Sequence, residues 1–203
     1  MERVATEPSD ERLMRRYQAG DVVAFELLLR RHRQAVYAFL HRLTGDGARA
    51  EDLAQETWLK IVASAPRWER RARFTTWAFA IARNLAVDEA RRSALRSPGA
   101  RSGGEGEPAL EVPADGPSPE RGAESALLRP KLEAALSALP VEQREVFVLR
   151  EYAGVPFAEI AEITGAEVPT VKSRMRYALE GLRAELVRRG VLPEGSDEEA
   201  RTA

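Results

Sequence analysis

Apolar residues recur every three to four positions through most of this chain, which is the spacing of helices that bury one face. Alternating strand patterns are not evident, and good helix formers such as Ala, Leu, Glu and Arg are abundant. The pattern predicts an all-α fold. The predicted helices lie near residues 10–19, 22–44, 48–65, 75–96, 127–138, 140–152 and 157–164, and a longer one is opened by Pro169.

Helix-breaking residues divide this pattern into two domains. A turn is predicted at 45–47, where Gly, Asp and Gly follow one another, and Pro66 predicts the end of the helix before it. Residues 97–126 are rich in Pro, Gly, Ser and Glu and lack aromatics, so they bury too little apolar area to offset their ordering entropy. We expect two small helical domains at 1–96 and 127–190, a flexible acidic linker at 97–126 and a disordered acidic tail at 191–203.

Composition narrows the class of protein. The 203 residues contain no cysteine, which excludes a disulfide framework, a cysteine zinc site and direct thiol redox sensing. No apolar run reaches membrane-spanning length, and the N-terminus lacks the apolar core of a secretory signal. We therefore expect a cytoplasmic protein without membrane insertion.

The net charge of −1 conceals a segmentation along the chain. Residues 1–96 carry 18 Lys and Arg against 13 Asp and Glu, and residues 126–190 carry 10 against 9. Residues 97–125 carry 2 against 6, and residues 191–203 carry 1 against 4. The acidic groups are concentrated in the linker and tail, so the overall charge does not exclude nucleic acid as a partner of the helical domains.

The last third of the chain has the pattern of a helix-turn-helix. A short helix reaches Gly165 and is followed by a longer one whose apolar stripe is Val171, Met175, Ala178, Leu182 and Leu186. Polar residues occupy a different face, which suits a recognition helix in a DNA major groove. The same pattern also fits an amphipathic hairpin with a solvated charged face. The candidate duplex-binding residues are Thr170, Lys172, Ser173, Arg174, Arg176 and Tyr177.

The first domain offers a candidate docking stripe for another protein. Asp52, Gln55, Glu56 and Leu59 lie three or four residues apart, so one helix face carries polar groups and an apolar member. Viewed alone, an ordinary solvated face explains this stripe better.

A second feature of the first domain combines arginines with aromatic residues. Arginine suits the phosphates and aromatic rings suit the unpaired bases of single-stranded DNA. Core packing is the better interpretation for Phe74 and Trp77, which share helical spacing with Ile81. The candidate single-strand-binding residues, including those on the next helix, are Arg70, Arg71, Arg73, Thr76, Asn84, Asp88 and Arg91. The alternative for the arginines and for the polar residues of the next helix is an ordinary solvent-exposed surface, and the sequence by itself does not decide between the two.

Four motifs in this order resemble an extracytoplasmic-function RNA polymerase sigma factor of the sigma-70 family. The first is GD-x-x-AF-x-x-L-x-x-RH-x-x-x-V at 20–36, and the second is AEDLAQETWLK at 50–60. The third is FTTWAFAIARNLAVDEARR at 74–92, and the fourth is TVKSRM at 170–175. The resemblance covers nearly the whole chain apart from the first residues, the linker and the tail.

The resemblance implies a role for each surface. The domain at 1–96 is similar to sigma region 2, whose stripe matching Asp52, Gln55, Glu56 and Leu59 docks on the clamp helices of the largest polymerase subunit. The segment matching Glu69–Phe74 and the helix bearing Asn84 and Asp88 would capture the unpaired −10 strand. The domain at 127–190 is similar to region 4, which reads the −35 element as duplex. The flap of the second-largest subunit and an anti-sigma factor are the further partners implied.

The linker length limits what the free protein can do. Promoter elements about 17 base pairs apart are separated by roughly 60 Å, whereas a flexible 29-residue coil averages about 30 Å and stretches to roughly 100 Å. The linker therefore bridges both elements only when polymerase holds it extended. Weak promoter binding by the free protein is predicted.

Three alternatives remain beside the sigma factor. An enzyme is disfavoured because only His32 and His41 are present and no metal-ligand spacing or glycine-rich phosphate loop occurs, so no catalytic residue and no cofactor are expected. A stand-alone helix-turn-helix regulator would bind duplex DNA tightly, usually as a dimer. It would leave the 50–60 stripe and the 70–77 patch without a role. A pure interaction protein such as an anti-sigma factor would leave the basic residues of 172–176 unexplained.

Overall fold

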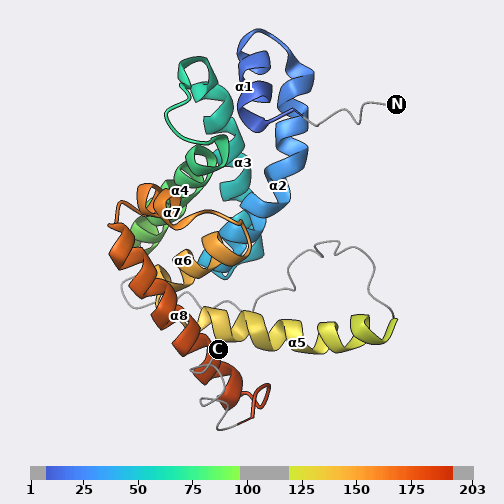
Figure 1. Ribbon diagram of the computed structural model, residues 1–203, viewed down its shortest axis with the longest axis vertical. Helices are drawn as coiled ribbons and strands as arrows, with labels where there is room; N and C mark the ends of the chain where they lie inside the picture. The colour runs from blue at the N-terminus through green and yellow to red at the C-terminus, as the bar shows by residue number, and fades with distance from the viewer. Residues whose placement is uncertain (1–7, 97–118, 194–203) are drawn as a thin grey trace, which may run out of the picture.

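The computed structural model describes residues 8–96 and 119–193, and every regular element among them is helical, which confirms the all-α fold (Figure 1). The elements in chain order are α1 (Asp10–Gln18), α2 (Val22–Thr44), α3 (Gly47–Ser64), the 3₁₀ turn η1 (Ala65–Arg67), α4 (Phe74–Arg96), α5 (Pro119–Ser137), α6 (Val141–Glu151), α7 (Phe157–Thr164) and α8 (Val168–Arg188).

Local capping interactions explain several of the helix ends. The side chains of Ser9, Asp21 and Asp46 each accept a hydrogen bond from the backbone amide three residues ahead, within the first turn, where amides lack the usual carbonyl partner four residues back. Gly45 ends α2 at φ 69° and Gly165 ends α7 at φ 67°, in the left-handed region that glycine adopts most readily. The turns that the sequence predicts at these glycines are confirmed.

Helix α5 begins earlier than the apolar pattern predicts. It starts at Pro119 rather than near Leu127 and continues through Pro130. A proline fits the first helical turn because its missing N–H has no intrahelical partner there, and the apolar pattern gives no sign of this polar first part. Residues 119–126 of the expected linker therefore belong to α5, whereas 97–118 lie outside the described residues. The expected disordered tail likewise falls largely outside them.

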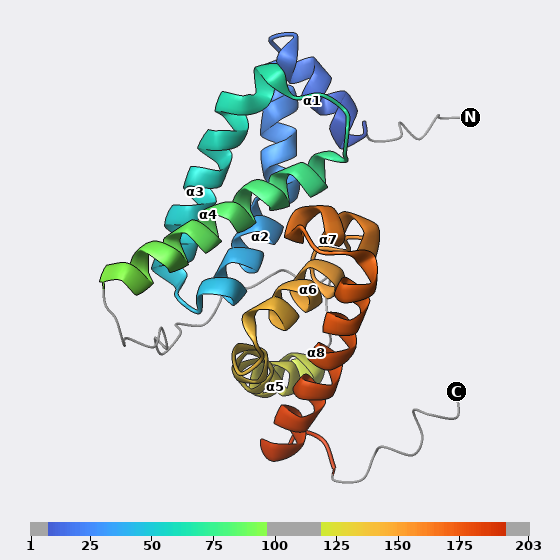
Figure 2. The same ribbon diagram turned by 90° about the vertical axis from the view of Figure 1, so that its left-hand side faces the viewer.

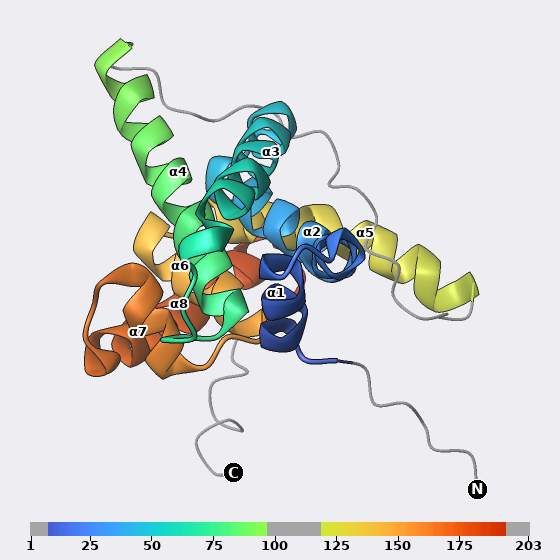
Figure 3. The ribbon, with the colours of Figure 1, turned by 90° about the horizontal axis from the view of Figure 1, so that it is seen from above.

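Helices α1 to α4 form the first half of the molecule. Helix α2 packs against α1 and α3, and α4 crosses them (Figures 1 and 3). One apolar cluster of this half is built from α1, α2, η1 and α4 together with Ile61 of α3. Its fully buried members include Leu13, Met14, Leu28 and Phe74.

Helices α5 to α8 pack directly on the first half. Helix α7 lies against α4, and α5 and α6 lie against α2 (Figure 2). Phe39 and Phe79 meet edge to face with ring centroids 5.4 Å apart, and the same apolar cluster continues into Val146 and Leu149 of α6. The two halves therefore share a hydrophobic core, and this packed state is the closed arrangement. None of the described helices combines the length and apolar content needed to cross a membrane.

Candidate polymerase- and nucleic-acid-binding surfaces

The outer face of α3 carries the predicted docking stripe. Asp52, Gln55 and Leu59 are exposed, and Glu56 is half-exposed with its carboxylate 3.5 Å from the Lys60 ammonium. The side chain of Leu59 is 69% exposed, which leaves a large apolar group in water within a polar surface. Such a group gains free energy when a partner covers it.

The buried face of α3 holds the helix in the orientation that exposes this stripe. Leu53, Thr57 and Ile61 are buried against the rest of the first half, and Thr57 donates a hydrogen bond to the Leu53 carbonyl. Val62, one turn beyond Leu59, is 38% exposed and extends the stripe. The sequence analysis did not predict Val62 as part of the stripe, although its spacing of three from Leu59 places it on the same helix face.

The loop at 68–73, between η1 and α4, exposes arginine side chains but no aromatic ring faces, and is named the arginine loop. Trp68 and Phe74 are buried in the apolar cluster, which confirms core packing for Phe74. Arg70, Arg71 and Arg73 are exposed. The loop therefore exposes positive charge to solvent, while the aromatic rings beside it pack into the core.

The outer side of α4 carries the remaining candidates for single-strand binding. Asn84, Asp88 and Arg91 are exposed and follow one another at spacings of four and three residues. They therefore share one face of α4. The inner face of the same helix, with Phe79, is buried in the core.

One predicted DNA-binding residue is buried between the halves. Thr76 is 3% exposed, and its hydroxyl donates to a carboxylate oxygen of Glu159 on α7. The other oxygen of the same carboxylate lies 3.1 Å from Nε of Arg73. In this arrangement Glu159 therefore holds two of the predicted −10 residues. No local pattern in the sequence pairs Glu159 with α4.

Two further ion pairs join the halves, and in each the cation comes from the first half, as in the Arg73–Glu159 pair. Arg83 of α4 pairs with Glu145 of α6, and Arg42 of α2 pairs with Glu133 of α5 at 2.7 Å. The Arg42 guanidinium also lies 3.8 Å from the ring centroid of Tyr152. In these contacts the first half supplies the cation and the second half supplies the carboxylate. Burial raises the pKa of the Glu145 carboxyl despite the opposing effect of Arg83, and burial also raises the pKa of Tyr152.

A polar cleft opens where α1, the arginine loop and α7 meet. Its volume is about 360 Å³. The side chains that line it are those of Glu11, Arg70, Arg71, Ala72, Arg73, Glu159 and Glu162. Since acidic groups from α1 and α7 face the arginines, the cleft carries both signs of charge.

Helices α7 and α8 form the predicted helix-turn-helix. Val171, Met175, Ala178 and Leu182 are buried and Leu186 is partly buried, which confirms the predicted apolar stripe.

The candidate −35 residues surround the exposed face of α8. Thr170, Lys172, Arg176 and Tyr177 are exposed, whereas Ser173 and Arg174 are half-buried. The Ser173 hydroxyl donates to the Thr170 carbonyl at 2.9 Å, and the Arg176 guanidinium stacks on the Tyr177 ring at 4.8 Å. The exposed cations lie within the first turns of α8, where backbone amides also favour phosphate.

The two histidines lie apart in the structure. His32 contacts Asp10, while His41 is buried and neither of its ring nitrogens has a hydrogen-bond partner among the described residues. Within 8–96 and 119–193, no group of three or more acidic or histidine side chains is placed to hold a metal ion.

Comparisons with known proteins identify the family to which both halves belong. The Sigma-70 region 2 family matches residues 28–96, and the Sigma-70, region 4 family matches residues 129–182. The chain is similar to the RNA polymerase sigma-H factor of Pseudomonas aeruginosa, with 31% identity over 187 residues that cover 87% of this chain and 93% of that protein. It is also similar to the ECF RNA polymerase sigma factor SigL of Mycobacterium tuberculosis, with 32% identity over 179 residues that cover 85% of this chain and 94% of SigL.

A solved structure shows the same likeness in three dimensions. The sigma factor RpoE, in its complex with the anti-sigma factor NepR from Bartonella quintana, matches 80% of this chain and 96% of its own at a TM-score of 0.65 and 27% identity. The chain therefore belongs to the extracytoplasmic-function group of RNA polymerase sigma factors in the sigma-70 family.

Proposed function

We propose that the outer stripe of α3 docks this chain on the clamp helices of core RNA polymerase. The arginine loop and the outer face of α4 then take the unpaired −10 strand, and α8 reads the −35 element in the major groove. The expected division into 1–96, 97–126, 127–190 and 191–203 follows these tasks, with the second helical domain extended by the start of α5 at Pro119. The chain contributes binding energy to promoter choice and strand opening rather than a catalytic step of its own.

The observation that carries this assignment is the exposed Leu59 within the acidic and amide stripe of α3. A stand-alone duplex-binding regulator has no use for this surface, because its DNA contacts lie on α8. Apolar area buried on docking contributes roughly 25 cal/mol per Å². Together Leu59 and Val62 supply a small apolar centre with a polar rim, which is the ordinary anatomy of a protein interface.

The closed arrangement implies that the halves separate before DNA is bound fully. Glu159 accepts a hydrogen bond from the buried Thr76 and pairs with the exposed Arg73, so Thr76 reaches a DNA strand only after the α4–α7 contact breaks. The predicted promoter geometry also needs the linker extended. Both observations support weak promoter binding by the free protein.

An anti-sigma factor and a cytoplasmic location complete the proposal. The RpoE structure contains an anti-sigma factor, which supports a similar partner for this chain. The flap of the second-largest polymerase subunit is the further contact proposed for the domain at 127–190.

Run-off transcription tests the assignment directly. Purified core polymerase is supplied with this protein on fragments from upstream of its own gene, and discrete new start sites are expected. The double charge reversal Asp52→Lys with Glu56→Lys should abolish these starts while leaving duplex binding by α8 unchanged. The opposite result, unchanged transcription by this variant, would remove the α3 docking role. Tight duplex binding without any start site would favour the stand-alone regulator.

A further inference from the structure

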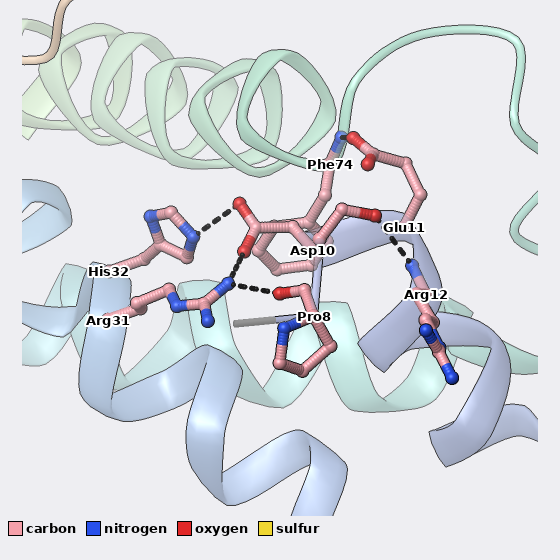
Figure 4. Close-up of polar contacts among 8 residues, drawn as sticks. Pro8, Asp10, Glu11, Arg12, Arg31, His32 and Phe74 are labelled. Atoms are coloured by element: carbon pink, nitrogen blue, oxygen red, sulfur yellow. Dashed lines mark hydrogen bonds and ion pairs between the residues drawn. The ribbon is translucent and has the colours of Figure 1, made fainter. Parts of the chain in front are cut away.

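Helix α1 is anchored to α2 by a partly buried polar contact. The two oxygens of the Asp10 carboxylate lie 2.7 Å from Nη1 of Arg31 and 2.8 Å from Nε2 of His32 (Figure 4). Arg31 also donates to the Pro8 carbonyl at 2.9 Å. Burial acts to raise the pKa of Asp10, but the hydrogen bonds from His32 and Arg31 outweigh it and hold the pKa below its ordinary value. The start of α1 is therefore fixed to α2 independently of the arginine loop.

The other polar contacts of α1 reach both ends of the arginine loop. At the first end, the Gln18 amide donates both protons, to the Ala65 carbonyl at 2.8 Å and the Trp68 carbonyl at 2.9 Å. At the last end, a Glu11 carboxylate oxygen accepts from the backbone N–H of Phe74 at 3.4 Å (Figure 4). That N–H is the first of α4 and has no partner within its own helix.

The loop itself holds few contacts that would fix its shape. Between Trp68 and Phe74 the backbone forms no regular element. The Arg71 amide donates to the Glu69 carbonyl at 2.7 Å, and the side chains of the same two residues pair at 2.8 Å while largely exposed. Contacts from α1 at both ends therefore restrict this segment more than its internal contacts do.

We propose that α1 is a positioning element for the arginine loop, with Gln18 and Glu11 as its two contacts, and that it presets the loop for a single DNA strand. This inference rests on the proposed function of the loop at the −10 element. The family match to region 2 begins at residue 28, so it does not include α1. A loop ordered in advance loses less conformational freedom when the strand binds, and the affinity rises accordingly.

The substitution Gln18→Glu tests the first contact with little change of shape. It replaces two donated hydrogen bonds by a carboxylate that faces two carbonyl oxygens. The matched control is Arg12→Ala, because both changes lower the net charge by one and the Arg12 side chain points away from Phe74 in Figure 4. The substitution Gln18→Lys retains a donor near both carbonyls and serves as the rescue.

Two readouts separate positioning from general destabilisation and from failure of the proposed function. The first is hydrogen exchange of residues 69–73 in the free protein, which needs no polymerase and should rise in Gln18→Glu alone. The second is holoenzyme binding to a single-stranded oligonucleotide spanning the −10 element mapped by run-off transcription. Its affinity should fall about tenfold, as expected for two lost hydrogen bonds, with core binding and −35 duplex binding within about twofold of the parent.

The outcomes are distinguishable. Equal loss of single-strand and duplex binding in Gln18→Glu, or unchanged loop exchange, would overturn the positioning role. Recovery of loop protection and single-strand affinity in Gln18→Lys would support it. If the parent protein gives no start sites, the proposed function fails, while the exchange experiment still decides whether α1 orders the loop.

Discussion

Removing the Glu159 carboxylate should open the two halves of the molecule. This side chain is 17% exposed and links α7 to α4 through Thr76 and Arg73. The substitution Glu159→Ala deletes both contacts and leaves the apolar cluster shared by the halves in place. The perturbation therefore isolates the polar part of the closed arrangement.

The magnitude follows from the burial of the two partners. The Thr76 hydroxyl is nearly inaccessible, and loss of its charged acceptor costs about 1.5–3 kcal/mol. Arg73 is 66% exposed, so its ion pair with Glu159 is screened by water and contributes only about 0.5 kcal/mol. The total is about 2–3.5 kcal/mol, which corresponds to a shift of about 30- to 300-fold in the ratio of open to closed molecules.

The absence of natural cysteines makes the distance between the halves easy to measure. One dye can be attached at Ala63→Cys on α3 and another at Ala184→Cys on α8, because both positions are exposed and the chain has no other thiol. Resonance energy transfer in the free protein should fall in Glu159→Ala relative to the parent. Binding of a −10 single strand without polymerase should strengthen in parallel.

Glu162→Ala is the control for this experiment. It removes the same charge from the same helix, but Glu162 is exposed and faces the polar cleft rather than Thr76. Equal changes in energy transfer for both substitutions would show that net charge, and not the Thr76 contact, sets the balance. An unchanged transfer in Glu159→Ala would refute the estimate for the buried hydroxyl.

Four further results are expected from single substitutions. Arg83→Gln should open the halves more than Glu145→Gln in the same energy-transfer assay, because the first leaves a buried carboxylate unpaired and the second resembles its protonated form. Burial raises the pKa of the Glu145 carboxyl in the folded protein. The contribution of Glu145 to stability is therefore fully present at acid pH and declines as pH rises through the carboxyl range. The substitution Glu145→Gln should abolish this pH dependence. The pKa of Asp10 is lowered, so its contribution is present at neutral pH and is lost as pH falls below the ordinary carboxyl range; unfolding of Asp10→Asn and the parent should converge in acid. Gly165→Ala has open space around it but a left-handed backbone, so it should lower the free energy of unfolding by about 1–2 kcal/mol, measured with urea.

Local signals made most of the helical layout predictable. The helix ends at Gly45 and Gly165 depend on interactions within a few residues, which the sequence displays directly. The exposure of the α3 stripe was also predictable, because helical spacing separates its polar residues from the buried ones. The start of α5 at Pro119 was not, since that first part has no apolar face to reveal it.

The contacts between the halves could not be predicted in the same way. Thr76 has the polarity and position of a DNA-facing residue, and only the docking of α7 buries it against Glu159. The pairing of Arg83 with Glu145 joins positions 62 residues apart, and no local pattern distinguishes these two side chains from other charged groups. The roles of the candidate residues in binding polymerase and DNA remain predictions that the experiments above test.

The accessibility of the surfaces in the closed arrangement indicates the order in which partners bind. Asp52, Gln55 and Leu59 are exposed while the halves are together, so polymerase can dock on α3 without prior opening. Thr76 is buried against Glu159 of α7, so the proposed −10 surface is complete only after opening. If the proposed function holds, docking should therefore precede capture of the strand, and contacts with polymerase should supply the free energy of opening. On this ordering, Glu159→Ala should accelerate strand capture by the holoenzyme while the association rate with core polymerase stays the same. A clearly faster association with core polymerase would instead place opening before docking.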